Sequence, residues 1–172
     1  TFSTENWKRP KKEITFLIYL LERYIDQKLH NLQKKNIKLN IIGNLSKFPN
    51  TLKIKLRKAI KDTNKNNKIQ INLALNYGSK QEIVSSVNKL IKTSLAINEK
   101  NITKNLYTKN IPDPEILIRT GNRNRLSNFL LWQSSYTEIF FIKKLWPDFN
   151  KSDFRKIILK FKNTRRNFGG IK

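Results

Sequence analysis

Cysteine and methionine are both missing from the 172-residue sequence, and histidine occurs once, as His30. Without cysteine the chain can form neither a disulfide nor a thiolate metal site. A single histidine cannot build a His-rich metal site or a Ser-His-Asp triad. The sequence also lacks an uninterrupted apolar run of about 18 residues, so no membrane-spanning helix is expected.

Acidic residues are scarce: 12 Asp and Glu stand against 36 Lys and Arg, and the formal charge is +24. Such an excess suits a nucleic acid, an anionic membrane or an anionic substrate. The alternative is ordinary solvated lysine, because the basic residues are spread along the whole chain. A nucleic-acid footprint would gather them on one face, and no nucleic-acid motif is present. We therefore expect no nucleic-acid partner.

Hydrophobic periodicity predicts alternating helices and strands. Apolar residues at three- and four-residue steps after Pro10 predict a long amphipathic helix, and shorter helices are expected near 52–60, from Ser79 and from Ser152 to about Arg166. Alternating or short apolar runs predict strands at 37–41, 69–75, 115–119 and 138–142. This order is typical of an α/β fold, a parallel sheet with helices on both faces, within one domain over 1–172.

Local signals refine these boundaries. Ser79 followed by Glu82 predicts a capping box, and Ser152 with Asp153 is expected to cap the last helix, which Gly169-Gly170 would end. The polar stretch 98–110 is expected to be irregular, and 128–133 to form a short helix.

Two polar segments fall at the expected carboxyl ends of strands, where ligands bind in such folds. They are Asn76-Tyr77-Gly78 and Arg119-Thr120-Gly121. With Arg125 and Ser127, the second offers two guanidinium forks and hydroxyls, which suit diphosphate oxygens. The alternative is a solvated loop with ordinary surface arginines.

Two further candidates are a polar segment and a lone carboxylate. Residues 1–10 place polar, charged and aromatic side chains before a helix, which suits an apolar ligand with an anionic head; the alternative is a capping segment. Glu138 stands alone in the apolar run 136–142. Burial of a carboxylate is costly unless it is paired or binds metal, so it is either a Mg2+ ligand or a partner of an arginine, or simply a sheet-edge glutamate.

These residues lead to a family. Phe2-Ser-Thr-Glu-Asn-Trp-Lys-Arg-Pro10, Leu73-Ala-Leu-Asn-Tyr-Gly78 and Ile118-Arg-Thr-Gly121 resemble motifs of cis-prenyltransferases of the undecaprenyl diphosphate synthase type. So do Arg125 to Gln133 with Tyr136-Thr-Glu138, Leu145-Trp-Pro-Asp-Phe149 and Arg165-Arg-Asn-Phe-Gly-Gly170. The resemblance runs along the whole chain in the family's order. The chain is identified as the larger C-terminal part of one such domain, with the catalytic-Asp segment upstream of Phe2.

The resemblance implies an isoprenyl transferase that condenses isopentenyl diphosphate with an allylic diphosphate, such as farnesyl diphosphate, to make long cis-polyprenyl diphosphates. It implies Mg2+ as cofactor, a hydrophobic tunnel to which Phe16, Leu20 and Leu21 contribute, a homodimer, and peripheral membrane contact through the product. The implied roles are Asn6 as catalytic residue, Glu138 as metal ligand, and a set of substrate-binding residues: Ser3, Thr4, Glu5, Trp7, Arg9, Arg119, Arg125, Leu126 and Ser127. An amide is a poor base, so Asn6 is expected to orient the proton transfer.

Departures and alternatives remain. The family often has Gly-Glu where this chain has Asn122-Arg123, and some members have a metal-linked His where it has Asn124. A non-catalytic subunit of a heteromeric prenyltransferase is one alternative, and a basic nucleic-acid-binding module is another. The expected location is the cytoplasm, or the plastid stroma for a plastid-encoded gene. Residues 1–172 alone are expected to lack turnover, because the catalytic Asp is not among them.

Overall fold

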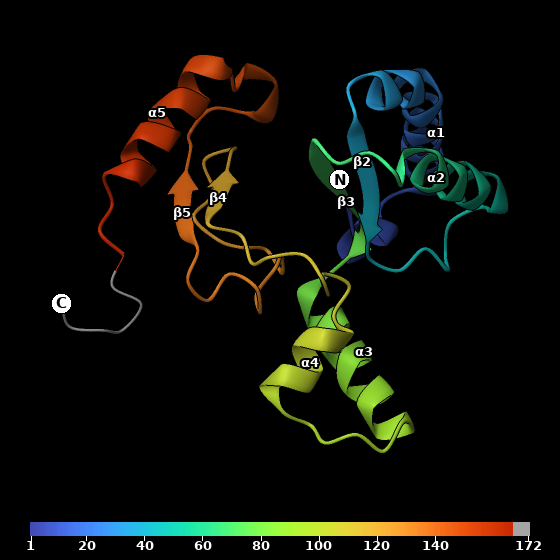
Figure 1. The fold of residues 1–172 in the computed structure, drawn as a ribbon. Coiled ribbons are helices and arrows are strands. Elements are labelled where there is room, and N and C mark those ends of the chain that lie inside the picture. The colour runs from blue at the N-terminus through green and yellow to red at the C-terminus, as the bar shows by residue number, and fades with distance from the viewer. Residues whose placement is uncertain (167–172) are drawn as a thin grey trace. The chain divides into compact units, whose positions relative to one another are not determined.

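The computed structural model describes residues 1–166, so the helix stop predicted at Gly169-Gly170 lies outside the described residues. The chain divides into two compact units, Thr1–Thr108 and Lys109–Lys172, and each is described by itself (Figure 1). Within the described residues, no helix is long and apolar enough to cross a membrane.

The first unit is built on a parallel sheet. Its strands are β1 (Phe2–Ser3), β2 (Ile37–Ile42) and β3 (Ile69–Tyr77), in the order β1-β3-β2. The register of β2 on β3 runs from Ile37 opposite Ile69 to Ile42 opposite Ala74. Both strands predicted from alternation are therefore confirmed, whereas the two-residue β1 is too short to show a pattern.

Two amphipathic helices cover this sheet. Helix α1 (Lys11–Lys34) begins after Pro10, and α2 (Asn50–Thr63) begins after Pro49. They pack against each other and against β2 (Figure 1). Their apolar sides meet alternate residues of β2 and β3 in one core, whose buried members are Phe2, Ile25, Leu39, Phe48, Leu52, Leu56, Ala59 and Leu75.

The third helix does not have the predicted cap. Helix α3 (Ser79–Lys92) begins after Gly78, and no side chain of that residue caps it. Glu82 is 1% exposed and accepts hydrogen bonds from the Tyr77 hydroxyl at 2.5 Å and the Tyr107 backbone N–H at 2.7 Å. The structure places the N-cap at Gly78 instead of Ser79, and the Glu82 carboxylate connects the end of β3 to a segment 25 residues later.

The segment predicted to be irregular contains a helix. Helix α4 (Glu99–Asn105) begins at Asn98, whose side chain accepts from the Asn101 backbone N–H at 2.9 Å. Ile102 is buried, and its carbonyl accepts from the Ser86 hydroxyl on α3. A side-chain cap and packing on α3 stabilise a helix whose own sequence is polar.

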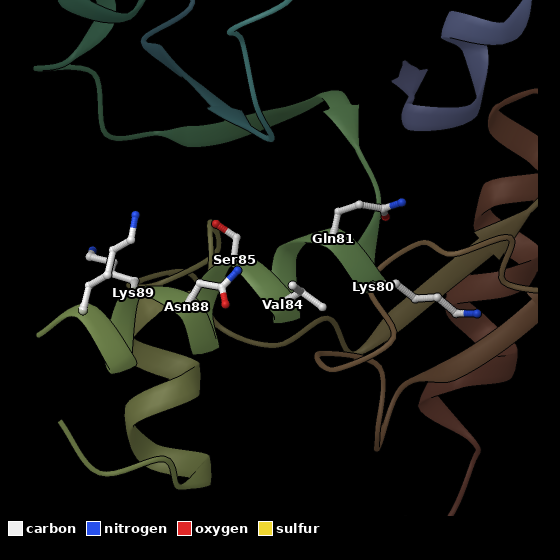
Figure 2. Close-up of a pocket in the computed structure, with 7 residues that line it drawn as sticks. Lys80, Gln81, Val84, Ser85, Asn88 and Lys89 are labelled. Carbon is white, nitrogen blue, oxygen red and sulfur yellow. The ribbon is translucent and has the colours of Figure 1, made fainter. Parts of the chain in front are cut away.

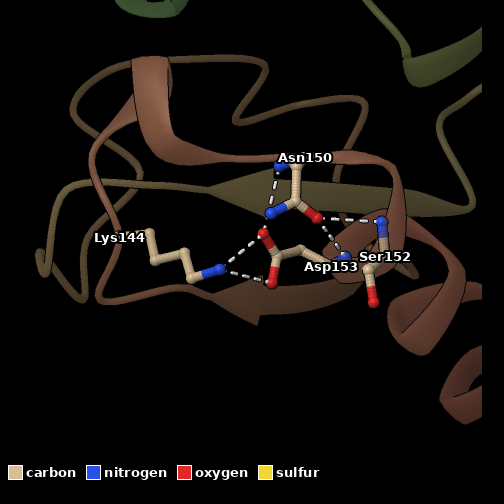
Figure 3. A network of polar contacts seen from close by, with 4 residues as sticks. All are labelled: Lys144, Asn150, Ser152 and Asp153. Carbon is tan, nitrogen blue, oxygen red and sulfur yellow. Dashed lines mark hydrogen bonds and ion pairs between the residues drawn. The ribbon is translucent and has the colours of Figure 1, made fainter.

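The second unit holds a parallel pair of strands, β4 (Ile116–Arg119) and β5 (Glu138–Phe141), as predicted. After the 3-10 turn η2 (Trp146–Asp148) comes α5 (Lys151–Lys162). Asn150, rather than Ser152 or Asp153, caps this helix, since its side-chain oxygen accepts from both of their backbone N–H groups (Figure 3). Asp153 returns the bond to the Asn150 N–H, which completes a capping box shifted two residues from the prediction.

The short helix predicted at 128–133 is absent from the structure, which has turns there. Ser127, Asn128 and Leu130 have φ values of 49°, 59° and 48°. Left-handed backbone at these positions is incompatible with a right-handed helix.

Candidate active site

The segment that connects β1 to α1 is a 3-10 turn, η1 (Thr4–Lys8), closed by Ser3 and Asn6. The Asn6 side-chain oxygen accepts from the Ser3 backbone N–H at 2.7 Å, and the Ser3 hydroxyl lies 3.2 Å from the same oxygen. Because the Ser3 N–H can only donate, the Asn6 atom facing it must be the carbonyl oxygen. Asn6 is thereby left with its NH2 group to offer to a ligand.

Trp7 connects this turn to the end of β3. Its indole N–H donates to the Asn76 side-chain oxygen at 2.8 Å, and the Asn76 amide donates to the Asn44 carbonyl at 2.7 Å. The indole also packs against Phe2 and Phe48, with ring centroids 4.9 and 5.2 Å apart. Trp7 therefore joins two of the predicted motifs, a contact that no local pattern indicates.

The approach of β2 to Asn76 depends on a glycine. Gly43 has a φ of +120°, and a Cβ atom there would lie 2.0 Å from the Leu75 carbonyl oxygen. Only a residue without a side chain fits this turn. The sequence predicted Gly43 only as the end of a strand. Its close approach to β3 can be seen only in the folded structure.

The other predicted residues of this segment differ in environment. Glu5 and Arg9 are exposed, and Arg9 is paired with Glu13 at 2.5 Å on the first turn of α1. The Thr4 hydroxyl is buried and has no hydrogen-bond partner among the described residues. A buried polar atom without a partner is unusual and suits a site that a ligand completes.

In the second unit, Arg119 ends β4 at the start of a left-handed loop. Its guanidinium lies 3.4 Å from the Ser127 hydroxyl, and its Nε is buried without a hydrogen-bond partner among the described residues. Gly121 and Asn122 have φ values of 90° and 54°, and their N–H groups donate to carbonyls of the segment after β5. Arg119 and Ser127 thus converge as predicted.

The other two predicted residues of this loop, Arg125 and Leu126, lie between Arg119 and Ser127 in the sequence. Arg125 is exposed and Leu126 is half-buried. An exposed guanidinium close in sequence to Ser127 can donate charge-assisted hydrogen bonds to an anion. The loop therefore has the chemistry of a phosphate site.

Glu138 does not have the buried setting that the sequence suggested. Its side chain is 36% exposed at the start of β5, and it lies 4.0 Å from the Arg166 guanidinium. Arg166 is closer to Glu115, at 3.3 Å, and donates to the Tyr136 carbonyl at 2.9 Å. The expectation that Glu138 is buried is wrong. The alternative that Glu138 pairs with an arginine agrees in part, because Arg166 is near it but lies closer to Glu115.

Mg2+ would find few protein ligands in either unit. Among residues 1–166, no three His, Cys, Asp or Glu side chains group closely enough to hold a metal. Mg2+ is often held by one or two carboxylates with waters and substrate phosphates. The accessible oxygens of Glu138 fit that mode of binding, and they do not form a complete protein site.

A cavity of about 300 Å³ lies between α1 and the sheet of the first unit. Its wall is mainly apolar, and polar side chains of α1 border it; it is lined by Tyr24, Ile25, Lys28, Asn31, Leu32, Lys35, Ile37, Leu39, Ala59, Ile71 and Leu73. Leu21 packs on the adjoining core, whereas Phe16 and Leu20 are 57% and 42% exposed. The latter two therefore do not line this cavity.

A second hollow, of about 690 Å³, lies along α3 (Figure 2). The side chains around it project from this helix alone, and they are Lys80, Gln81, Val84, Ser85, Asn88, Lys89 and Lys92. None of the predicted site residues lines it, and it has neither a carboxylate nor an aromatic ring.

Known proteins resemble this chain over nearly its whole length. Residues 1–169 match the family model of the undecaprenyl diphosphate synthases. The isoprenyl transferase of Prochlorococcus marinus is 43% identical over 99% of this chain, which spans 65% of that protein. The isoprenyl transferase of Campylobacter jejuni is 43% identical over 98% of the chain, which spans 75% of it.

Solved structures share the fold. The crystal structure of a probable undecaprenyl diphosphate synthase from Campylobacter jejuni superposes with a TM-score of 0.89 at 42% identity, covering 98% of this chain and 80% of that one. Lavandulyl diphosphate synthase from Lavandula x intermedia, solved with dimethylallyl diphosphate, gives a TM-score of 0.90 at 30% identity, covering 98% and 76%. The predicted α/β fold is confirmed, and the chain belongs to the undecaprenyl diphosphate synthase family of isoprenyl transferases.

Proposed function

We propose that the protein elongates an allylic diphosphate, such as farnesyl diphosphate, with isopentenyl diphosphate to give long cis-polyprenyl diphosphates. The observation that carries this proposal is the match to isoprenyl transferases over nearly the entire chain. Because the chain spans 65% to 75% of the relatives named above, the activity is assigned to the protein that includes this chain.

The isopentenyl diphosphate is bound by the loop after β4. Arg119, Arg125 and Ser127 supply guanidinium and hydroxyl donors, and Leu126 contributes apolar contact. The 3.4 Å contact between Arg119 and Ser127 and the buried, unpartnered Nε of Arg119 support this role. A guanidinium binds two diphosphate oxygens at once, which an ammonium cannot do with the same geometry.

The turn before α1 contacts the reacting substrates. Ser3, Thr4, Glu5, Trp7 and Arg9 surround them, and Asn6 orients the proton transfer. The unpartnered Thr4 hydroxyl and the fixed Asn6 amide support this assignment.

Each elongation step makes one carbon–carbon bond. The C–O bond of the allylic diphosphate breaks, and its electron pair leaves with the diphosphate. The terminal alkene carbon of isopentenyl diphosphate bonds to the allylic carbon, which leaves positive charge on the methyl-bearing carbon beside it. Loss of one proton from the next carbon toward the diphosphate then forms the new cis double bond. Mg2+, when bound with Glu138, would neutralise charge on the diphosphate.

Two apolar surfaces support a cavity for the growing chain and a homodimer. The apolar cavity beside α1 accommodates part of a growing isoprenoid chain. In the second unit, Phe141, Leu145, Trp146 and Phe154 are between 41% and 73% exposed, an apolar surface that suits a second copy of the chain in a homodimer. The product is a lipid, and its release requires contact with a membrane.

The test is incorporation of labelled isopentenyl diphosphate into butanol-extractable product, with farnesyl diphosphate and Mg2+, by the protein that includes this chain. Elongation that is abolished by Arg119→Ala and retained by Lys100→Ala, an exposed change on α4, supports the proposal. Absence of elongation by the folded protein alone, with elongation restored by a second prenyltransferase subunit, would assign it the non-catalytic role.

A further inference from the structure

The turn that carries Asn6 has little burial to hold it in place. None of the five residues of η1 is buried, and a 3-10 turn has poorer hydrogen-bond geometry than an α-helix. The Ser3–Asn6 bond connects the start of the turn to β1. Trp7 attaches the turn to the core, because its ring packs on two phenylalanines and its N–H donates to Asn76. The placement of the turn therefore depends on how Trp7 is held.

The hydrogen bond to Asn76 gives the indole its orientation. Hydrophobic contact is non-directional, so packing on Phe2 and Phe48 does not by itself specify where the N–H edge of the ring points. The bond from the indole N–H to the Asn76 side-chain oxygen, at 2.8 Å, is directional. Asn76 thus sets the orientation of the Trp7 ring within its apolar surroundings.

Asn76 is itself held through both its side chain and its backbone. Its amide donates to the Asn44 carbonyl at 2.7 Å, and because a carbonyl only accepts, the Asn76 side-chain oxygen is left to face Trp7. Its φ of 47° lies in the left-handed region that asparagine tolerates better than most residues. At 7% exposure, the side chain has little access to water that could replace either bond. The Asn76 amide is therefore a fixed support for the indole.

We propose that Asn76 is a positioning residue of the proposed reaction, which fixes the Trp7 indole and thereby places the turn with Thr4 and Asn6 against the reacting diphosphates. Both polar atoms of the Asn76 side chain bond to protein, so Asn76 acts through Trp7 and not on the substrate. This inference rests on the proposed function and deepens it. An error of about 1 Å in the placement of such groups can cost about a hundredfold in rate.

The hold on Trp7 can be measured without any substrate. In the protein that includes this chain, labelled with 15N-tryptophan, the indole signal of Trp7 is the one that Trp7→Phe removes. Asn76→Gly removes the side chain and is compatible with the φ of 47°. In this variant the Trp7 indole N–H should exchange with solvent about tenfold faster, the effect expected for loss of one hydrogen bond.

Asn40→Ala is the matched control for this exchange measurement. It removes an amide bond between β2 and β3, from Asn40 to the Asn72 side-chain oxygen at 2.9 Å, in which neither Trp7 nor Asn76 takes part. Exchange of the Trp7 indole N–H should stay within about twofold of the wild type in this variant. Unchanged exchange in Asn76→Gly, or equal acceleration in both variants, would overturn the proposal.

Kinetics separate positioning from substrate binding. Asn76→Gly should lower kcat about tenfold or more, because the turn loses its placement. Its KM for isopentenyl diphosphate should stay within about threefold of the wild type, because the loop after β4 binds that substrate in the proposed reaction. Asn40→Ala should keep the wild-type kcat. An equal fall in kcat in the two variants would reduce the effect to lost stability and would contradict the positioning role.

A second variant tests transmission through Trp7. Trp7→Phe keeps the Asn76–Asn44 bond and an aromatic ring, and it removes only the indole donor of the shared bond. Because Trp7→Phe and Asn76→Gly remove the same bond, the double variant should have a kcat within about threefold of the slower single variant. Effects on kcat that multiply in the double variant would show that Asn76 does not act through Trp7.

The outcomes distinguish this inference from the proposed function. If the wild-type protein elongates farnesyl diphosphate and Asn76→Gly does so with the same kcat, the proposed function stands and the positioning role fails. If the wild-type protein does not elongate, the proposed function fails together with the catalytic part of this inference. The exchange of the indole N–H then still decides whether Asn76 holds Trp7.

Discussion

The hydrogen bond between Trp7 and Asn76 should be the main polar connection between the turn before α1 and the end of β3. Trp7→Phe removes the indole donor at 2.8 Å and keeps an aromatic ring against Phe2 and Phe48. Asn76→Ala removes that bond and also the 2.7 Å bond to the Asn44 carbonyl. A double-mutant cycle on these two positions isolates the energy of the single contact that they share.

The expected magnitudes follow from burial. Asn76 is 7% exposed, so the loss of its amide leaves two groups without partners, each at a cost of about 1–3 kcal/mol. Asn76 also has a φ of 47°, where alanine is disfavoured by roughly 1 kcal/mol. We expect Asn76→Ala to lower the free energy of unfolding by about 3 kcal/mol or more, Trp7→Phe by about 1–2 kcal/mol, and the coupling energy to be about 1 kcal/mol.

Urea unfolding followed by far-ultraviolet circular dichroism measures these values without relying on tryptophan fluorescence, which Trp7→Phe changes. The control pairs Trp7→Phe with Asn40→Ala, because the Asn40 amide donates to the Asn72 side-chain oxygen at 2.9 Å, a bond in which neither Trp7 nor Asn76 takes part. That pair should be additive within about 0.5 kcal/mol. A Trp7–Asn76 coupling no larger than that of the control pair would refute the structural role assigned to this bond.

Four other predictions concern single sites. Gly43→Ala should lower the free energy of unfolding by about 3 kcal/mol or more, because the added Cβ would lie 2.0 Å from a carbonyl oxygen of β3; a loss below about 1 kcal/mol in urea unfolding would be inconsistent with that clash. Arg119→Lys should raise the KM for isopentenyl diphosphate about tenfold or more, and an unchanged KM would remove Arg119 from that site. Glu138→Gln should raise the Mg2+ concentration needed for half-maximal activity; lowered thermal stability with unchanged metal dependence would instead assign Glu138 to its ion pair. The hydrogen bond from Lys144 holds the pKa of Asp153 below its ordinary value, so this contact stabilises the fold at pH values above the ordinary pKa and stops doing so as the pH falls through the lowered pKa. The difference in unfolding free energy between wild type and Asp153→Asn should therefore shrink on acidification. A difference that stays constant with pH would contradict this.

The strands and long helices could be predicted from the sequence because their signals are periodic. Alternation at 37–41 and 69–75 reflects one side of β2 and β3 facing the helices, and the three- and four-residue steps after Pro10 reflect the side of α1 that meets the core. The agreement with burial is partial, because Leu39 and Leu75 are buried whereas Ile69 and Ile71 are 56% and 37% exposed. The elements that lack such patterns, β1 and α4, were not predicted: β1 has two residues, and α4 is stabilised by a cap and by α3.

The errors share a physical cause, which is that a polar side chain can be used in several ways. Glu82 has the spacing of a capping box, yet it is buried between Tyr77 and Tyr107. Asn150 takes the cap that was assigned to its neighbours, because the chain turns two residues earlier than periodicity indicates. Glu138 stands in an apolar run but lies at the first position of β5, where its side chain reaches solvent and Arg166. Sequence spacing does not distinguish among these partners, and tertiary contact does.

The setting of Asn6 narrows the ways in which a proton can leave isopentenyl diphosphate in the proposed reaction. An amide carbonyl is a weak base, and that of Asn6 already accepts a hydrogen bond from the Ser3 N–H at 2.7 Å. Proton acceptance by Asn6 would require that bond to break, which leaves a part-buried N–H unpaired at a cost of about 1–3 kcal/mol. The remaining NH2 group can only donate, and its natural acceptor is a diphosphate oxygen. In the proposed reaction we therefore expect the proton to pass to the departing diphosphate, with Asn6 holding the oxygen that accepts it.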